Sequence, residues 1–422
     1  MVKLSGEFDA QVAAAHSRMA EVLEPTPLQM NQLLSDRHAA RIWLKREDLT
    51  PVRSYKLRGA FTFFASVIEG GDAPDRFVCA SAGNHAQGFA FACKHFNCKG
   101  IVFMPVTTPQ QKIMKTAGFG APNVEIRLVG DSFDEAYKHA IAYCEEHGAM
   151  MVPPFDDERI VAGQAGVAKE IIEQFPAGEK IDLVILPVGG GGLASGVVRY
   201  FALASPDTKF LFVEPDAAPS LHDSLKASER IRLGQVDNFV DGAAVAQIGA
   251  VNFEALKKFS ADDVILAPTN GLCATMMDML NHEGIVLEPA GALAIDALRR
   301  VDPARIRGMN IVAIVSGGNF DFERLPEVKE RALKFSGLKK YFILQMPQRP
   351  GALKDFLLML GPEDDIARFE YLKKSARNFG SVLIGLETTK AENFDRLTAK
   401  LADSGMRFQD ITDNEIVGNL VV

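Results

Sequence analysis

The stretch VILPVGGGGLASG, residues 184–196, joins an apolar run to a helical segment through Gly189, Gly190, Gly191 and Gly192. Missing Cβ atoms let successive backbone N–H groups converge on an anion, and the dipole of the following helix favours negative charge there. A simple turn needs only one or two glycines, so four of them predict a phosphate-binding loop. No Gly-Lys-Ser follows, and no GxGxxG motif comes with an acid placed to bind ribose, so nucleotide and dinucleotide sites are disfavoured.

Short apolar runs alternate with amphipathic stretches around this loop, from about residue 75 to 320. Strands are expected at 77–82, 100–105, 124–130, 149–155, 181–189, 209–215, 262–268 and 309–318. Helical spacing of apolar residues marks 84–96, 108–118, 132–148, 161–175, 193–205 and 275–284. This alternation predicts an α/β region whose parallel sheets are covered by helices and bind ligands at the carboxyl ends of their strands.

A different pattern follows the charged stretch LPEVKERALKFSG at 325–337. Strands are expected at 339–347, 365–372, 381–389 and 406–413, with helices at 351–360 and 392–405. The order β-α-β-β-α-β in roughly eighty residues is that of a ferredoxin-like α+β domain. We therefore expect a second domain at about 339–422.

The bulk composition bounds the class of protein. The 422 residues are 47% hydrophobic and 24% charged, with a formal net charge of −8. These values are ordinary for a globular protein, and they favour neither a nucleic-acid nor a membrane partner. The N-terminus has no apolar signal-peptide core, and no apolar run has the length of a membrane span. The five cysteines fit no metal-ligand spacing, so we expect a cytoplasmic protein with reduced thiols.

A phosphate site without nucleotide motifs directs attention to the lysine in RSYKLRGA, residues 53–60. Pyridoxal phosphate needs a lysine for a Schiff base, a phosphate cup and a partner for its ring nitrogen. An isolated lysine is almost always a solvated surface charge, but Lys56 does not stand alone. Further segments with polar side chains follow strands or precede helices: SAGNHAQG (81–88), VEP (213–215), EGIVLEPAGA (283–292) and VSGGN (315–319).

These segments, with TPL (26–28) and LKREDLTPVRSYKLRGAF (44–61), resemble the fold-type II pyridoxal-phosphate enzymes, and most closely the threonine dehydratases (threonine ammonia-lyases). The resemblance covers nearly the whole chain. It implies pyridoxal 5′-phosphate as the cofactor and two parallel-type sheets in the catalytic region. The implied division is a catalytic region at 1–324 with a smaller mobile subdomain at about 53–153, a linker at 325–338 and an ACT-like regulatory domain at 339–422.

The resemblance also implies roles for individual residues. Lys56 and Ser81 would be catalytic, with Lys56 forming the Schiff base and removing the Cα proton of the substrate. The implied cofactor contacts are Lys56, Asn84, Gly189, Gly190, Gly191, Gly192, Leu193 and Ser316. The implied substrate contacts are Ser81, Ala82, Gly83, Asn84 and His85. A lysine amine must be neutral to react, and burial or nearby cations lower its pKa from about 10.4; whether Arg53 or Arg58 lies close enough stays open.

The reaction implied is the dehydration and deamination of L-threonine to 2-oxobutanoate and ammonia, the first step of isoleucine biosynthesis, with some activity on L-serine. A carboxylate at the ring nitrogen would deepen the electron sink, whereas the hydroxyl of Ser316 cannot keep that nitrogen protonated. A shallower sink should favour expulsion of the β-substituent over transamination.

Related activities are alternatives: serine dehydratase, serine racemase, threonine synthase, or an inactive amino-acid-sensing homologue. Ala82 stands where racemases of the family carry a serine, and alanine has no proton to transfer. Glu214 could bind a cation, but Ser220 stands where a second carboxylate would be expected and Asp216 is only a spare ligand, so we expect no bound metal. GQAGVA (163–168) departs from the more usual GQGT of the dehydratases.

QMPQRPGALKDFL, residues 345–357, resembles the start of the regulatory domain of biosynthetic threonine dehydratases. Pro350 and Gly351 can shape a strand-to-helix turn whose helix N-terminus receives a carboxylate. The resemblance implies isoleucine as a feedback inhibitor and valine as a candidate antagonist. The alternative is a dimerisation module without a ligand. A homodimer or homotetramer is expected, because symmetric assemblies are the commonest.

Overall fold

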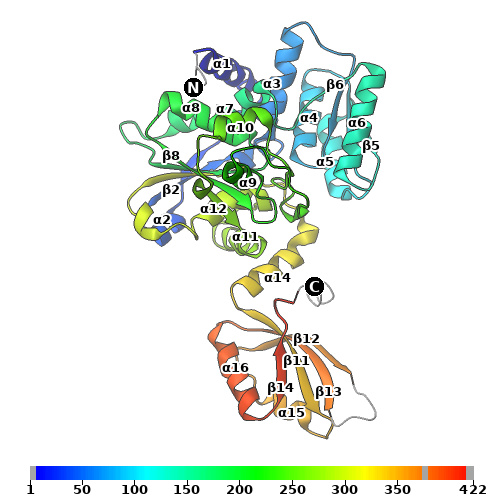
Figure 1. Ribbon diagram of the computed structural model, residues 1–422, viewed down its shortest axis with the longest axis vertical. Coiled ribbons are helices and arrows are strands. Elements are labelled where there is room, and N and C mark those ends of the chain that lie inside the picture. Colours follow the sequence, from blue (N-terminus) through cyan, green and yellow to red (C-terminus); the bar gives the residue numbers. More distant parts are fainter. Residues whose placement is uncertain (1–5, 373–378, 415–422) are drawn as a thin grey trace. The chain divides into compact units, whose positions relative to one another are not determined.

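The structure is a computed structural model that describes residues 6–372 and 379–414. The chain divides into two compact units, one made of Met1–Thr269 with Glu283–Asp321 and the other of Asn270–His282 with Phe322–Val422. Figure 1 follows the chain through both units. None of the helices in the described part of the chain has the length and apolarity to cross a bilayer.

The first unit contains a six-stranded sheet with the strand order β1-β2-β10-β7-β8-β9. Its strands are β1 (Leu28–Met30), β2 (Arg41–Arg46), β7 (Leu183–Pro187), β8 (Lys209–Pro215), β9 (Val264–Ala267) and β10 (Asn310–Val315). All neighbours are parallel except β1 and β2. The central strands β7 and β10 are buried along their whole length, which explains their unbroken apolar sequences.

Helices cover this sheet on both faces. The helices of this part of the chain are α1 (Gly6–Met19), α2 (Gln32–His38), α7 (Glu158–Gln174), α8 (Gly192–Ala204), α9 (Ser220–Ala227), α10 (Ala250–Leu256), α12 (Pro289–Ala297) and α13 (Pro303–Ile306), with α11 (Thr269–Glu283) at the boundary of the units. Short 3-10 turns are η1 (Glu47–Leu49), η2 (Asn238–Val240) and η3 (Ala261–Asp263). Side chains of α7, α8 and α10 share one core with Val184, Leu186 and Val312, whereas α12 packs on β7, β8 and β10.

A second, smaller sheet in the same unit has the order β5-β4-β3-β6, and all its neighbours are parallel. Its strands are β3 (Phe77–Ala80), β4 (Gly100–Met104), β5 (Val124–Leu128) and β6 (Met150–Met151), and its helices are α3 (Lys56–Glu69), α4 (Asn84–His95), α5 (Gln110–Gly120) and α6 (Phe133–His147). Phe64, Phe77 and Phe89 pack together on one face, while α6 covers the other. Both expected parallel sheets are therefore confirmed.

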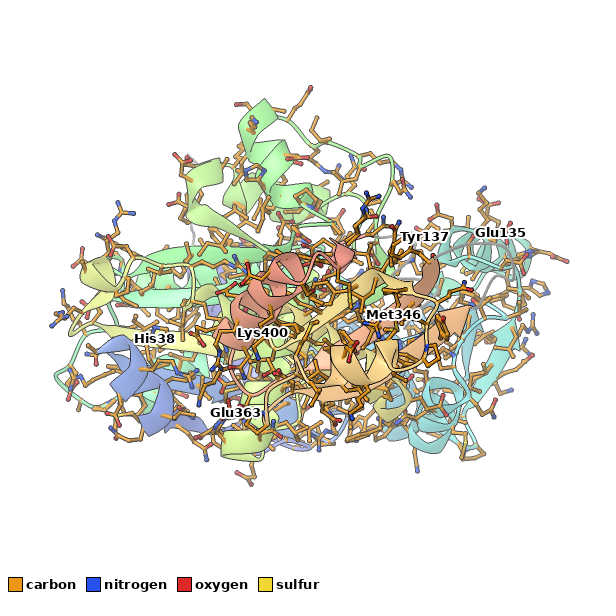
Figure 2. The ribbon with its side chains drawn as sticks, turned by 90° about the horizontal axis from the view of Figure 1, so that it is seen from below. His38, Glu135, Tyr137, Met346, Glu363 and Lys400 are labelled. Atoms are coloured by element: carbon orange, nitrogen blue, oxygen red, sulfur yellow. The ribbon has the colours of Figure 1, made fainter. Side chains whose placement is uncertain are left out.

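The C-terminal fold is the expected ferredoxin-like one. Its elements are β11 (Lys339–Pro347), α15 (Ala352–Leu357), β12 (Asp365–Leu372), β13 (Phe379–Glu387), α16 (Glu392–Asp403) and β14 (Arg407–Asp410), preceded by η4 (Phe322–Arg324) and α14 (Leu325–Phe335). The antiparallel strands have the order β12-β13-β11-β14. Met346 lies in the core formed with α15 and α16, whereas Glu363 and Lys400 are exposed (Figure 2).

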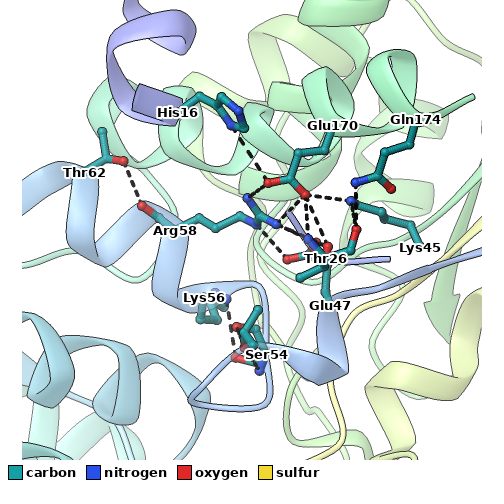
Figure 3. A network of polar contacts seen from close by, with 11 residues as sticks. His16, Thr26, Lys45, Glu47, Ser54, Lys56, Arg58, Thr62, Glu170 and Gln174 are labelled. Atoms are coloured by element: carbon teal, nitrogen blue, oxygen red, sulfur yellow. Dashed lines mark hydrogen bonds and ion pairs between the residues drawn. The ribbon is translucent and has the colours of Figure 1, made fainter. Parts of the chain in front are cut away.

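A buried ionic network lies beneath the start of α3 (Figure 3). Arg58 bonds Glu47 through Nε to Oε2 at 2.7 Å and Nη2 to Oε1 at 2.9 Å, and its Nη1 lies 2.7 Å from Glu170 Oε1. Lys45 Nζ donates to Glu170 Oε2 and to the Thr26 carbonyl, each at 2.6 Å. The four charged side chains are at most 2% exposed, so two cations and two carboxylates neutralise one another away from water.

Two glycines allow the helices that carry this network to approach closely. A Cβ at Gly59 on α3 would lie 2.4 Å from Gln164 Nε2, and one at Gly163 on α7 would lie 2.6 Å from the Arg58 carbonyl oxygen. The first of these would meet the end of a flexible side chain, but the second would meet backbone. Gly163, the first glycine of the GQAGVA segment, thus has a packing role between α3 and α7.

Candidate active site

Lys56 is the first residue of α3, and its amine faces a carbonyl rather than a carboxylate. Its Nζ donates to Pro154 O at 2.8 Å and lies 5.5 Å from the centre of the Tyr55 ring and 5.7 Å from that of Phe155. Burial lowers the pKa of Lys56 to about 8, and the charge of Glu288 opposes only part of that shift. Burial thus brings the amine toward its neutral, reactive form.

The two arginines that flank Lys56 in sequence have other roles. Arg58 points into the buried ionic network, where Glu47 and Glu170 compensate its charge. Arg53 adopts a left-handed backbone conformation with φ of 57°, and its charge lowers the pKa of Lys115, for which burial is the larger cause. Neither arginine contributes to the pKa shift of Lys56, which answers the question that the sequence left open.

The four glycines form the expected turn between β7 and α8. Gly191 has φ of +87°, a conformation that favours glycine, and a Cβ at Gly190 would lie 2.2 Å from the Phe155 ring. The Gly190 carbonyl accepts from Asn252 Nδ2 at 2.7 Å and from Gly249 N at 3.1 Å, which fixes the loop. Because the first N–H groups of a helix have no partner within it, the start of α8 can bind an anion.

Asn84 opens α4 and is held by side chains from two distant segments. Its Nδ2 donates to Glu288 Oε1 at 2.6 Å, and its Oδ1 accepts from Asn319 Nδ2 at 2.7 Å. Glu288 directly precedes α12 and is 4% exposed. The segments 81–88, 283–292 and 315–319 therefore meet at one place, as the sequence predicts for the carboxyl ends of parallel strands.

Ser316 follows β10 and lies next to the segment that carries Lys56. Its carbonyl accepts from Tyr55 N at 3.2 Å, and Ser54 forms a bridge with Gly317. The Ser316 hydroxyl is buried and donates to Ala290 O at 3.2 Å. Ser316 thus contacts both Tyr55, the residue before Lys56, and the first turn of α12.

The loop between β3 and α4 contains the other expected site residues. Ser81 Oγ accepts from Gly83 N at 3.2 Å, and residues 81–84 are each partly exposed. His85 differs, because its ring is buried and its Nε2 lies 3.0 Å from Val152 O. Burial lowers the pKa of His85 to about 3, with the Lys56 charge adding to that shift, so the ring is neutral and faces the protein interior. A role for His85 in binding would fall to its backbone.

Comparison with protein families decides the assignment. Residues 19–317 match the family described as pyridoxal-phosphate dependent enzyme, and residues 330–421 match the C-terminal regulatory domain of threonine dehydratase. The chain belongs to the threonine dehydratase family. Like other enzymes of the family, it is a lyase whose cofactor is pyridoxal phosphate.

Relatives that match this chain over nearly their whole length support the assignment. The L-threonine dehydratase biosynthetic IlvA of Halalkalibacterium halodurans is 43% identical over 97% of this chain and 98% of its own length. The protein of the same name from Bacillus subtilis is 42% identical over 97% of this chain and 96% of its own length. The processed form of threonine deaminase isoform 2 from Solanum lycopersicum is 38% identical, with a TM-score of 0.72 over 78% of this chain and 94% of that chain.

The residues of the candidate site fit the cofactor. The turn at Gly189–Gly192 leaves no room for side chains and opens a helix of 13 residues, as a phosphate group requires. The amine of Lys56, the amide of Asn84 and the hydroxyl of Ser316 lie on segments that contact one another. The site offers amide, hydroxyl and amine groups. These groups suit a cofactor that has a ring, a phosphate and an aldehyde.

Glu214, which by sequence could bind a cation although no bound metal is expected, caps a helix. Its carboxylate accepts from Leu221 N at 2.7 Å, from His222 N at 2.9 Å and from Ser220 Oγ at 3.2 Å. Burial raises the pKa of Glu214 to about 8, although these hydrogen bonds oppose the shift. The described residues contain no group of three or more His, Cys, Asp or Glu side chains that could hold a metal ion.

The sequence did not assign a role to Glu288 or Asn319, although both lie in quoted motifs. The signal was present in one case: Glu288 is the only charged residue in the small and apolar run VLEPAGA. A carboxylate in such a run at a strand-helix boundary is costly to bury unless it has a partner. The partner, Asn84, lies 204 residues away, so sequence spacing could not identify it.

Proposed function

We propose that this protein converts L-threonine to 2-oxobutanoate and ammonia in the biosynthesis of isoleucine. Water leaves in the elimination and is taken up again in hydrolysis, so the net change is one threonine to one 2-oxobutanoate and one ammonia. The observation that carries the proposal is Lys56, a buried amine whose pKa is lowered to about 8 beside segments that match a pyridoxal-phosphate enzyme.

Each residue would act at a defined atom. Lys56 would hold the cofactor through its amine and then remove the Cα proton of the substrate. The amides of Gly189, Gly190, Gly191, Gly192 and Leu193 would hold the phosphate, Asn84 would contact the 3′ oxygen, and Ser316 would face the ring nitrogen. When bound, the cofactor withdraws electrons from Cα and makes its proton acidic.

The loop of Ser81, Ala82, Gly83 and Asn84 would bind the substrate carboxylate at the start of α4. Hydroxide is a poor leaving group, so the β-oxygen must receive a proton as it departs. Ser316 offers a hydroxyl instead of a carboxylate, which favours expulsion of that group over transamination. L-serine carries the same β-hydroxyl and is expected to react as a second substrate.

Regulation is proposed for the C-terminal domain, which matches the regulatory domain of threonine dehydratase. Isoleucine would bind there and lower activity, with valine as an antagonist. The helix after Gly351 has only six residues, so it provides no extended N-terminal site by itself. Assembly as a homodimer or homotetramer and a cytoplasmic location are likewise proposed.

The test is a steady-state assay with L-threonine, L-serine and phosphohomoserine offered side by side, with and without isoleucine. The proposal expects 2-oxobutanoate from threonine and inhibition by isoleucine. Turnover of phosphohomoserine alone, or racemisation of serine without ammonia release, would contradict it. A chain truncated before residue 339 should keep turnover and lose inhibition; a truncated enzyme that is still inhibited at the same concentration rejects the regulatory proposal.

A further inference from the structure

Glu288 is a buried carboxyl that contacts the site without an assigned role. Its Oε1 lies 2.6 Å from Asn84 Nδ2, and its backbone N–H donates to Gly317 O at 3.3 Å. Ala290, two residues later, accepts the hydroxyl of Ser316. Glu288 and the first turn of α12 therefore support both residues that would contact the cofactor ring, Asn84 and Ser316.

The space for this carboxyl is provided by a glycine of another motif. A Cβ at Gly317 would lie 2.1 Å from Glu288 Oε1 and 2.8 Å from its Cδ. Any side chain at residue 317 would displace the carboxyl from Asn84. The glycine after Ser316 thus serves the contact between Glu288 and Asn84.

The hydrogen bonds around Asn84 fix the orientation of its amide. Asn319 Nδ2 donates to Val52 O at 2.7 Å, and a carbonyl can only accept, so the nitrogen of Asn319 is assigned. The same nitrogen meets Asn84 Oδ1, so Asn84 Nδ2 must face Glu288. One N–H of Asn84 is then held by Glu288, and the second remains for a ligand.

Titratable groups from several elements face Glu288. Lys56 and Tyr55 lie at the start of α3, Lys112 and Lys115 on α5, and Asp241 after η2. The charges of Arg53 and Asp321 also act on Lys115. Burial raises the pKa of Glu288 to about 7, and Asp241 adds to the shift, while Asn84, Lys112 and the Asn319 N–H oppose it. The carboxyl consequently changes its charge in the neutral range.

We propose that Glu288 is a positioning residue for the cofactor: it turns the second N–H of Asn84 toward the 3′ oxygen, and its ionisation changes the charge beside that oxygen. The inference rests on the proposed function, in which Asn84 contacts that oxygen. Glu288 would thus act through two properties: the hydrogen bond that its carboxyl accepts from Asn84, and the proton that the carboxyl gains or loses.

The test uses the full-length holoenzyme and follows the absorbance of the bound cofactor at about 410–420 nm between about pH 5.5 and 8.5, because this band responds to charge at the ring substituents. The wild-type protein should show a change with a midpoint near 7, the pKa of Glu288. Glu288→Gln still offers an oxygen to Asn84 but cannot titrate, so this change should disappear. Glu214→Gln is the matched control, because it alters a second buried carboxyl that caps α9, and the change should persist.

The affinity of the cofactor-free protein for pyridoxal phosphate gives the second readout. Glu288→Gln should stay within about threefold of the wild type, because a neutral hydrogen bond replaces a charge-assisted one. Glu288→Asp keeps a titrating group but withdraws it from Asn84, so affinity should fall by about tenfold or more. This variant also carries the test should Glu288→Gln not fold.

The outcomes separate the two proposals. A Glu288→Gln holoenzyme that titrates as the wild type does, or a Glu288→Asp variant with unchanged affinity, would overturn the role of Glu288. A yellow, active wild-type holoenzyme without any titration near pH 7 would also reject it and leave the proposed function intact. A wild-type protein that fails to bind pyridoxal phosphate would instead overturn the proposed function itself.

Discussion

Lys56, which is half-buried, and Arg58, which is fully buried, are two cations on the first turn of one helix, and their surroundings have opposite effects. Arg58 meets two carboxylates that outweigh the cost of burial and keep its pKa raised. Lys56 meets the Pro154 carbonyl, so burial prevails and lowers its pKa to about 8. The difference shows how two paired carboxylates can reverse the effect that burial alone has on the pKa of a cation. A fixed charge and a reactive group can therefore be two residues apart.

Removal of the reactive cation should have the largest effect. Lys56→Ala is expected to lower the rate of 2-oxobutanoate release by at least about 10³-fold, because the general base is lost. The variant should also lack the absorbance of the bound cofactor at about 410–420 nm. Lys56→Arg keeps a cation and should be equally inactive; normal ammonia release by either variant would contradict the role of Lys56.

Removal of the structural cation, Arg58, should mainly lower the stability of the folded protein. Arg58→Met leaves Glu47 and Glu170 with only Lys45 as a counter-charge, so we expect a loss of about 3–5 kcal/mol in the free energy of unfolding. Denaturant unfolding of the cofactor-free protein measures this loss. Arg58→Lys keeps the charge without the fork of donors and should lose less. A variant as stable as the wild type would show that the network contributes little.

The pH dependence of cofactor capture tests the shifted pKa of Lys56. Only the neutral amine reacts, so the rate of pyridoxal-phosphate binding to the cofactor-free protein should rise about tenfold per pH unit below the pKa and level off above it. The break is expected near pH 8, the lowered pKa of Lys56. Stopped-flow absorbance between pH 6 and 10 measures it. A rate that still rises about tenfold per pH unit up to pH 10 would mean an unshifted amine.

The smallest effect is expected at the edge of the ionic network. His16 Nδ1 lies 3.9 Å from Glu170 Oε1, and burial lowers the pKa of His16 despite that carboxylate. His16→Gln should change the free energy of unfolding by less than about 1 kcal/mol near pH 8. Because the lowered pKa opposes protonation in the folded protein, the wild type should lose stability relative to the variant as the pH falls below 6.5. Equal pH profiles would contradict this.

Much of the fold could be predicted from local sequence pattern. Strands β7 and β10 are buried on both faces and appear as unbroken apolar runs, and the glycines mark the turn between β7 and α8. Strand β2 has no counterpart among the expected strands, because RIWLKR contains three cations and one of them, Lys45, is buried against Glu170. Tertiary pairing with β10 overrides the local signal there.

The charged stretch expected as a linker at 325–338 contains the helix α14. Val328 and Ala332 are buried, so a narrow apolar face is enough to stabilise a helix in a sequence rich in lysine and glutamate. Sequence motifs singled out Lys56 and Asn84, and the structure places them on contacting helices, while their roles stay predictions. The site was not predictable at Glu288 or in the network of Arg58, whose partners are brought together only by the fold.

The close contact of Gly59 and Gly163 sets the distance between α3 and α7. The buried charges on these two helices can neutralise one another only at that distance. A methyl group at residue 163 would press on the backbone of α3 and push it away from α7. Arg58 on α3 and Glu170 on α7 would then separate, and the pairs Arg58–Glu47 and Lys45–Glu170 would lose the contact that joins them. Random mutagenesis of the whole chain should accordingly find residue 163 as intolerant as residue 58, although the glycine carries no charge and no side chain that could join the network.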